Sequence, residues 1–252
     1  PHFINPQLAG EAYMWPAGPV GVVLSHGFTA TTAEVRPLAQ RLLAAGYSVA
    51  GPLLPGHGTT PEDLNTRHWP EWVAALEAAY TALAARCGRV FVGGESMGAM
   101  LALHVASRHP EAAGLLLYAP AIQTTVRLRD IALAAAVSRV QPLRPKPPRP
   151  ATAVDPLWQG YDVYPTRALL QFFRLQWETR RRLPRITQPV LIVQGRLDAT
   201  VHPLAGLLIE AGVTSERQEL HWMERSTHCV VLDEELPQIA ALTLDFLARN
   251  AN

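Results

Sequence analysis

Residues 94–98 read Gly94-Glu95-Ser96-Met97-Gly98, between the apolar run 90–92 and the helical pattern 99–103. A G-x-S-x-G stretch between a buried strand and a helix is typical of a sharp turn that presents one serine hydroxyl at the edge of a sheet. Bulky side chains at Gly94 or Gly98 would clash with the neighbouring strand and helix. The stretch therefore predicts Ser96 as a catalytic nucleophile. The alternative interpretation is a serine N-cap flanked by two packing glycines.

A serine nucleophile needs a base, and the base needs a carboxylate to orient it. Asp198 and His228 each lie in a loop after a strand-like run, 189–193 and 218–222 respectively. Parallel sheets gather functional residues in such loops, and Ser, Asp, His is a known chain order for this triad. Alternatively, Asp198 caps a helix near residue 203 or forms an Asx-turn, and His228 is an ordinary loop histidine. Glu224 is the best substitute acid, but it stands too close to His228 in the chain.

Ester chemistry also requires two backbone N–H groups that stabilise the oxyanion. Met97 follows the nucleophile at a predicted helix N-terminus, where the helix dipole favours negative charge. A second donor is expected after the strand 20–24, in the sequence 25–29. Gly27 allows a tight turn there, so the N–H of Phe28 is the predicted donor, and His26 is predicted to brace the loop.

Five segments together resemble the α/β-hydrolase superfamily, and more narrowly the small bacterial carboxylesterases and monoacylglycerol lipases. They are the Ser96 turn, the Asp198 loop, the His228 loop, residues 26–28 and the Pro-Gly-His-Gly sequence at 55–58. The resemblance covers nearly the whole chain outside residues 121–187. It implies Ser96, Asp198 and His228 as nucleophile, acid and base, and Phe28 and Met97 as oxyanion donors. It also implies that the Phe28 side chain lines the acyl site.

The hydrophobic pattern alternates strands with helices along most of the chain, which predicts a mostly parallel sheet covered on both faces. Strands are expected at 19–25, 47–53, 89–94, 114–118, 189–194 and 216–222. Helices are expected at 32–45, 69–86, 97–109, 203–211 and 234–249, and a Pro- and Gly-rich loop leads up to residue 68. The fold class is thus α/β, an α/β-hydrolase fold with a small inserted helical cap. The predicted core is 1–120 with 188–252, and the predicted cap is 121–187.

The segment 121–187 breaks this alternation. It contains two helical patterns, 126–140 and 165–183, separated by a run of prolines that excludes regular helix or central strand. A disordered linker is the alternative to a cap. Trp158, Tyr161 and Tyr164 would anchor the cap or line the pocket, and Phe28, Trp158 and Val201 are the residues expected to contact the substrate.

Composition limits the partners. The 252 residues are 48% hydrophobic and 17% charged with a net charge of +1, which argues against a nucleic-acid binder. The segment 121–187 holds twelve basic and four acidic residues, a net +8, and leaves −7 for the rest. This charge would allow transient contact with an anionic lipid surface, although a solvated arginine-rich face without a partner is the interpretation we favour.

The sequence also lacks the signals of a membrane span, a metal site and a cofactor site. The sequence has no run of 18 apolar residues, so no membrane span is predicted. It also has no pair of histidines with the spacing of a metal site and no glycine motif of a dinucleotide-binding site, so no cofactor is expected. Cys87 and Cys229 form no disulfide framework. We therefore expect a cytoplasmic protein, with export left open because Pro1 begins the sequence. Oligomeric state has no sequence signal.

The function predicted from these residues is a serine carboxylesterase acting on small-molecule esters with short to medium acyl chains, monoacylglycerols included. The alternative is another serine hydrolase with the same triad: a thioesterase, an amidase or peptidase, or a C–C hydrolase. A non-catalytic receptor that uses the same pocket is a third interpretation.

Overall fold

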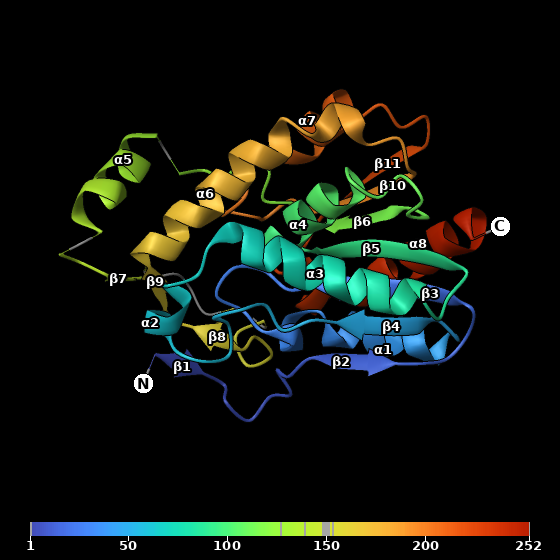
Figure 1. Cartoon of the computed structure of the whole chain (residues 1–252), viewed down its shortest axis with the longest axis horizontal. Coiled ribbons are helices and arrows are strands. Elements are labelled where there is room, and N and C mark those ends of the chain that lie inside the picture. The colour runs from blue at the N-terminus through green and yellow to red at the C-terminus, as the bar shows by residue number, and fades with distance from the viewer. Residues whose placement is uncertain (1, 127, 139, 148–151, 153, 252) are drawn as a thin grey trace.

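The structure is a computed structural model that describes residues 2–126, 128–138, 140–147, 152 and 154–251. Within these residues the central sheet has seven strands in the order β11-β10-β6-β5-β3-β4-β2. All its pairings are parallel except β2 with β4, so β2 is an antiparallel edge strand (Figure 1). The strands are β2 Tyr13–Trp15, β3 Val20–Ser25, β4 Ser48–Gly51, β5 Arg89–Glu95, β6 Leu115–Tyr118, β10 Val190–Gly195 and β11 Gln218–Met223.

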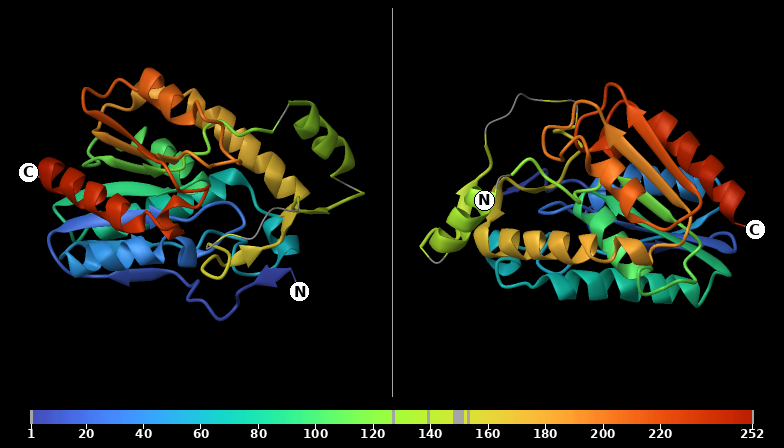
Figure 2. Two further views of the ribbon diagram at one scale, coloured as in Figure 1. Left: turned by 180° about the vertical axis from the view of Figure 1, so that it is seen from behind. Right: turned by 90° about the horizontal axis from the view of Figure 1, so that it is seen from above.

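Helices cover both faces of this sheet. One face carries α3 (Trp69–Ala84), α4 (Met97–Ala106) and α7 (Ala205–Gly212), and the other carries α1 (Arg36–Ala44) and α8 (Leu236–Asn250), which lie in front in the left view of Figure 2. Successive strand residues point to opposite faces, so Val23 packs under the first group while Val22 and Leu24 pack under the second. This arrangement confirms the predicted fold class.

The expected loop before residue 68 is wrong in one place, because it contains the short helix α2 (Pro61–Leu64). Thr60 accepts a hydrogen bond from the backbone N–H of Asp63, and Pro61 occupies the first helical position. A capping threonine and a proline at the first position are common at helix N-termini, and here they stabilise a helix of a single turn. The described residues also contain three short 3-10 turns: η1 Thr32–Glu34, η2 Leu183–Arg185 and η3 Val230–Leu232.

Residues 121–187 lie between β6 and β10, and the described part of this segment contains two α-helices and three short strands besides the turn η2. They are α5 Leu128–Val137, β7 Leu143–Pro145, β8 Gly160–Tyr161, β9 Val163–Pro165 and α6 Thr166–Arg180. The helix α6 packs against α3 and α4, while α5 lies at the outer end of α6 (Figure 1). Strand β7 pairs with β9, and β8 pairs with β1 (Phe3–Ile4). Both predicted helices are therefore present but shorter than expected; positions 127 and 139 of the first lie outside the described residues.

None of the helices that the structure describes combines the length and the apolar character of a membrane-spanning segment.

Candidate active site

Ser96 occupies the turn between β5 and α4 with a strained backbone. Its φ is 55° and its ψ is −109°, a region that residues with a side chain rarely adopt. The backbone N–H of Ser96 donates to the carbonyl oxygen of Tyr118 on β6 at 2.9 Å, which fixes the turn to the sheet. The Ser96 side chain makes no capping hydrogen bond to α4, so the N-cap alternative is not what the structure adopts.

The two glycines of this turn allow a very close approach of backbone. A methyl group on Gly94 would lie 2.4 Å from the carbonyl oxygen of Ser25, and one on Gly98 would lie 2.1 Å from the same oxygen. Real Cβ atoms do not approach oxygen so closely. The loop after β3 can therefore pass beside Ser96 only because both positions lack a side chain.

Ser96, His228 and Asp198 lie within hydrogen-bond distance of one another in that order. Nε2 of His228 is 3.0 Å from Oγ of Ser96, and Nδ1 of His228 is 2.8 Å from Oδ2 of Asp198. The other carboxylate oxygen of Asp198 accepts hydrogen bonds from the backbone N–H groups of Thr200 at 2.7 Å and Val201 at 2.9 Å. Asp198 thus forms the Asx-turn considered from the sequence and also contacts the histidine.

The electrostatics of this group favour an ion pair between Asp198 and His228. Burial opposes the charge on each residue, but their mutual attraction and hydrogen bond outweigh it. The pKa of Asp198 is lowered and the pKa of His228 is raised. The Asp198 side chain is 1% exposed and that of His228 is 22% exposed, so only the imidazole reaches solvent.

The alternative acid and base lie elsewhere. Glu224 is exposed and contacts Arg196, with Oε1 3.3 Å from Nε, and not His228. His26 is buried; its Nε2 accepts from the backbone N–H of Leu54 at 3.1 Å, and its Nδ1 lies 2.9 Å from the carbonyl oxygen of Gly27. Burial lowers the pKa of His26 to about 4, so the ring is neutral and braces the loop.

The two predicted oxyanion donors come from the residue after Ser96 and from the loop after β3, and their role stays a prediction. Met97 is the first residue of α4, and its N–H belongs to the first turn, which has no intrahelical acceptor. Phe28 lies in the loop after β3. Its ring packs with its centroid 5.4 Å from that of Phe172 on α6 and 6.0 Å from that of Trp72 on α3.

The other predicted substrate contacts have structural partners. Val201 is fully buried, forms an isolated bridge with Thr124, and holds Asp198 through its N–H. Trp158 is partly buried and donates from its indole Nε1 to Oε1 of Glu34 at 2.9 Å. Contact of Val201 and Trp158 with a substrate stays a prediction. Tyr161 is buried, and its hydroxyl donates to the carbonyl oxygen of Gly56 at 2.8 Å, so it anchors β8 to the core.

Two buried carboxyl groups beside Ser96 were missed from the sequence. Glu95 is fully buried with Oε2 3.4 Å from the N–H of Val231, and burial raises its pKa well above the usual range. Glu34 is 3% exposed. The one sequence signal for Glu34 is an acidic residue between Ala33 and Val35, on the apolar side of the segment that enters α1.

Within the described part of the chain, no three His, Cys, Asp or Glu side chains are grouped so that they could hold a metal ion.

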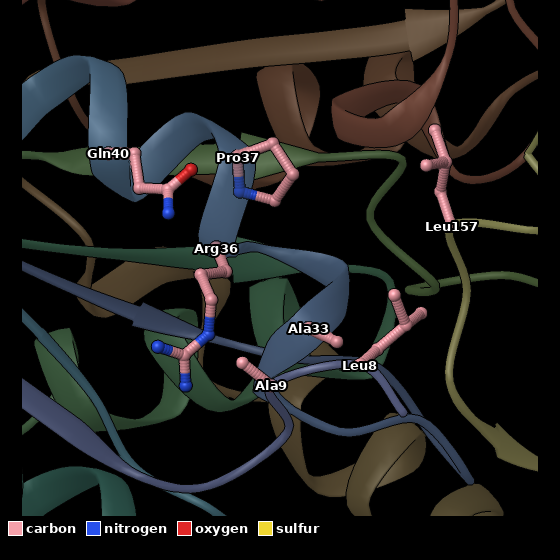
Figure 3. A pocket seen from close by; sticks show the side chains of 7 residues that line it. All are labelled: Leu8, Ala9, Ala33, Arg36, Pro37, Gln40 and Leu157. Carbon is pink, nitrogen blue, oxygen red and sulfur yellow. The ribbon is translucent and has the colours of Figure 1, made fainter. Parts of the chain in front are cut away.

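A hollow of about 140 Å³ lies apart from Ser96, between the N-terminal loop, the beginning of α1 and residue 157 (Figure 3). Its lining is mostly apolar, and it is formed by Leu8, Ala9, Ala33, Arg36, Pro37, Gln40 and Leu157.

Residues 20–235 match the family model described as serine aminopeptidase, S33, a family of α/β hydrolases. The chain belongs to this family. The predicted resemblance to the α/β hydrolases is confirmed.

Relatives of this α/β hydrolase include named enzymes. The chain is 36% identical to the thermostable monoacylglycerol lipase of Bacillus sp. strain H-257, over 98% of each chain. It is 23% identical to a carboxylesterase of Bacillus subtilis strain 168, over 95% of this chain and 96% of the relative. A solved structure from work on the metagenome-derived lipolytic enzymes LipS and LipT superposes with a TM-score of 0.89 at 34% identity, covering 96% of this chain and 99% of the other.

Proposed function

We propose that this α/β hydrolase is a serine carboxylesterase that cleaves short- to medium-chain carboxylic esters, monoacylglycerols included. The observation that carries the proposal is the continuous hydrogen-bonded path from Oγ of Ser96 through His228 to Asp198. The names of the relatives, a monoacylglycerol lipase and a carboxylesterase, support an ester as the substrate.

The proposed reaction has two acyl-transfer steps. Nε2 of His228 takes the proton of Ser96 while Oγ attacks the ester carbonyl, and the N–H groups of Phe28 and Met97 stabilise the oxyanion. His228 then protonates the departing alcohol as the C–O bond breaks, leaving the acyl group on Ser96. His228 next removes a proton from water as the water oxygen attacks the acyl-enzyme, and it then returns that proton to Oγ of Ser96 as the Ser96–acyl bond breaks and the acid is released. Asp198 stays ionised and keeps the proton of the neutral imidazole on Nδ1.

We further propose that residues 121–187 form a cap on the acyl site. Support comes from Phe172 of α6, which packs against the ring of Phe28 next to the expected oxyanion donor. The net charge of +8 on this segment would allow transient contact with an anionic lipid surface, but a solvated arginine-rich face without a partner is the interpretation we favour. Equal recovery with phosphatidylglycerol and phosphatidylcholine vesicles in a co-sedimentation assay is therefore the expected result, and recovery with phosphatidylglycerol vesicles alone would establish a charge-driven contact.

The description of the family as serine aminopeptidases supports a second candidate, amide-bond cleavage by the same three side chains. Amides and esters pass through the same tetrahedral intermediate, so the geometry of Ser96 serves both. Substrate comparison decides between them: turnover of aminoacyl p-nitroanilides above that of p-nitrophenyl esters would favour the peptidase.

The test of the proposed function combines labelling with turnover. Pure protein is treated with a fluorophosphonate probe, the modified residue is mapped by mass spectrometry, and p-nitrophenyl esters from acetate to palmitate are assayed alongside acyl-CoA and aminoacyl p-nitroanilides. We expect labelling at Ser96, turnover of the shorter esters, and loss of both in Ser96→Ala with an unchanged melting temperature. Esterase activity in Ser96→Ala would refute the assignment, and the absence of labelling and turnover in the wild type would favour a receptor.

A further inference from the structure

Glu34 uses both carboxylate oxygens to connect three segments of the molecule. Oε2 accepts the backbone N–H of Gly27 at 2.6 Å, and Oε1 accepts the indole N–H of Trp158 at 2.9 Å. The thiol of Cys229, the residue after His228, lies 3.7 Å from Oε1. Burial raises the pKa of Glu34, and the hydrogen bonds from Gly27, Trp158 and Cys229 oppose that rise. Because both oxygens accept hydrogen bonds, this buried side chain constrains all three segments.

The contact with Gly27 is close to the reacting atoms. Gly27 immediately precedes Phe28, and a methyl group on Gly27 would lie 3.0 Å from Oε2 of Glu34 and 3.3 Å from Cβ of Ser96. Gly27 is thus wedged between the Glu34 carboxylate and Ser96. A shift of the carboxylate would move the peptide that carries the N–H of Phe28.

The segment that carries Trp158 contacts the same loop along its length. The N–H of Tyr161 donates to the carbonyl oxygen of Thr29 at 2.9 Å, and Thr31 donates from Oγ1 to Oε1 of Gln159 at 2.7 Å. Ala30 and Gly160 form a β-bridge. Residues 158–161 therefore lie beside residues 29–31 as a short paired segment.

Lys146 makes a further contact between the inserted segment and this loop. Its Nζ donates to Oγ1 of Thr29 at 2.8 Å and lies 4.4 Å from the centroid of the Trp158 ring. Thr29 has a positive φ of 65°, which is strained for a threonine. A strained backbone persists only where its surroundings hold it, and here the inserted segment supplies those contacts.

We propose that Glu34 is a positioning residue that sets the oxyanion loop, residues 27–31, only while Trp158 and the segment around it are seated against that loop. Acyl-transfer activity thereby depends on the placement of the inserted segment. This inference rests on the proposed function, because it assigns residues 27–31 to the oxyanion site.

The chemistry of glutamine provides a specific test. In the wild type, both carboxylate oxygens of Glu34 accept an N–H. Glu34→Gln keeps the shape of the side chain but replaces one of these acceptor oxygens with an NH₂ donor. The NH₂ group must therefore face either Gly27 or Trp158, donor against donor. Trp158→Phe removes one of those two donors, so the double variant Glu34→Gln/Trp158→Phe lets the amide oxygen accept from Gly27 without that conflict.

The expected kinetic result is non-additive. Glu34→Gln should lower kcat by roughly tenfold or more with KM within about twofold, because the loop acts on the oxyanion and not on the ground state. Trp158→Phe alone should cost less, and the double variant should recover most of the loss of Glu34→Gln. Inhibition by a trifluoromethyl ketone, which forms a tetrahedral adduct on the serine, should weaken in parallel with kcat/KM.

Two matched controls use the same substitutions elsewhere. Trp177→Phe changes a tryptophan of α6 that is 57% exposed, and Glu224→Gln changes an exposed glutamate beside the His228 loop. Both should keep wild-type kinetics. A double variant no more active than Glu34→Gln would overturn the proposal, as would Glu34→Gln with wild-type kcat.

Hydrogen–deuterium exchange separates this inference from the proposed function, because it needs no turnover. The amide of Gly27 should exchange slowly in the wild type, faster in Glu34→Gln, and slowly again in the double variant. A wild type without esterase activity but with this exchange pattern would refute the ester hydrolase and keep the role of Glu34. An active wild type whose loop exchange is identical in all variants would refute the role of Glu34 alone.

Discussion

Oδ2 of Asp198 lies 2.8 Å from Nδ1 of His228, while Oδ1 of the same carboxylate accepts the N–H groups of Thr200 and Val201. One residue therefore closes its own loop and orients the imidazole. Backbone N–H groups of its own loop therefore hold the acid in position. Glu224 contacts Arg196 and not His228, so the choice between Asp198 and Glu224 is testable.

Asp198→Asn should lower kcat by roughly 10³- to 10⁴-fold, because an amide NH₂ at Oδ2 would favour the imidazole tautomer that cannot accept the Ser96 proton. The assay is turnover of p-nitrophenyl butyrate. Glu224→Gln is the matched control and should retain wild-type kcat. The assignment is wrong if the two variants lose activity to the same extent.

The pH profile of kcat/KM should decrease on its acid side (the acid limb) with a midpoint above pH 6.5. The pKa of His228 is raised from its ordinary 6.5, since the Asp198 carboxylate outweighs the effect of burial. The imidazole is a base only when neutral, so kcat/KM should fall as the pH drops through that raised value. The pKa of Asp198 is lowered, so its ionisation stays constant over the same range.

A pH-stat assay with a neutral ester measures this limb, and NMR titration of the imidazole in Ser96→Ala gives an independent value. An acid limb centred below pH 6 would show that His228 does not carry the reaction or is not paired with Asp198.

Gly98→Ala should disrupt the turn at Ser96. The added methyl group would lie 2.1 Å from the carbonyl oxygen of Ser25, which is backbone and cannot rotate away. Overpacking of this kind costs on the order of 1–3 kcal/mol, and about 2–4 °C of melting temperature per kcal/mol in a chain of this size.

Gly88→Ala is the control for Gly98→Ala, since a methyl group on Gly88 meets no atom within 4 Å. Thermal unfolding followed by circular dichroism compares the two. Equal melting temperatures would contradict the close approach of β3 to the turn.

Gly160→Ala should lower kcat by separating the inserted segment from the loop after β3. Its methyl group would lie 2.1 Å from the carbonyl oxygen of Thr29, the acceptor of the Tyr161 N–H. We expect a loss of roughly tenfold in kcat and a melting temperature below that of Gly88→Ala, because the methyl group meets backbone as it does in Gly98→Ala. The kcat is therefore measured well below the unfolding transition of the variant. Wild-type kcat in this variant would show that the loop tolerates the separation.

Most of the architecture was predictable because its signals are local. The order of apolar and polar residues predicts strands and helices that match the structure within a few residues. The helix α2 and the short strands β1, β2, β7, β8 and β9 lie outside those expected ranges. The placement of Asp198 near His228 was predictable for a related reason: β10 and β11 are parallel neighbours, so the loops that follow them meet at one edge.

The sequence by itself determined the turn at Ser96, the strand–helix alternation and the chain order of Ser96, Asp198 and His228, since each depends on residues close together in the chain or on the rules of parallel sheets. Tertiary structure alone decided that Glu34 meets Gly27 and Trp158. The partners Glu34 and Trp158 are 124 residues apart, and their contact depends on how the inserted segment packs on the core. Contacts between side chains so far apart leave no periodic pattern in the sequence, because the local structure around each residue forms equally well without the other residue.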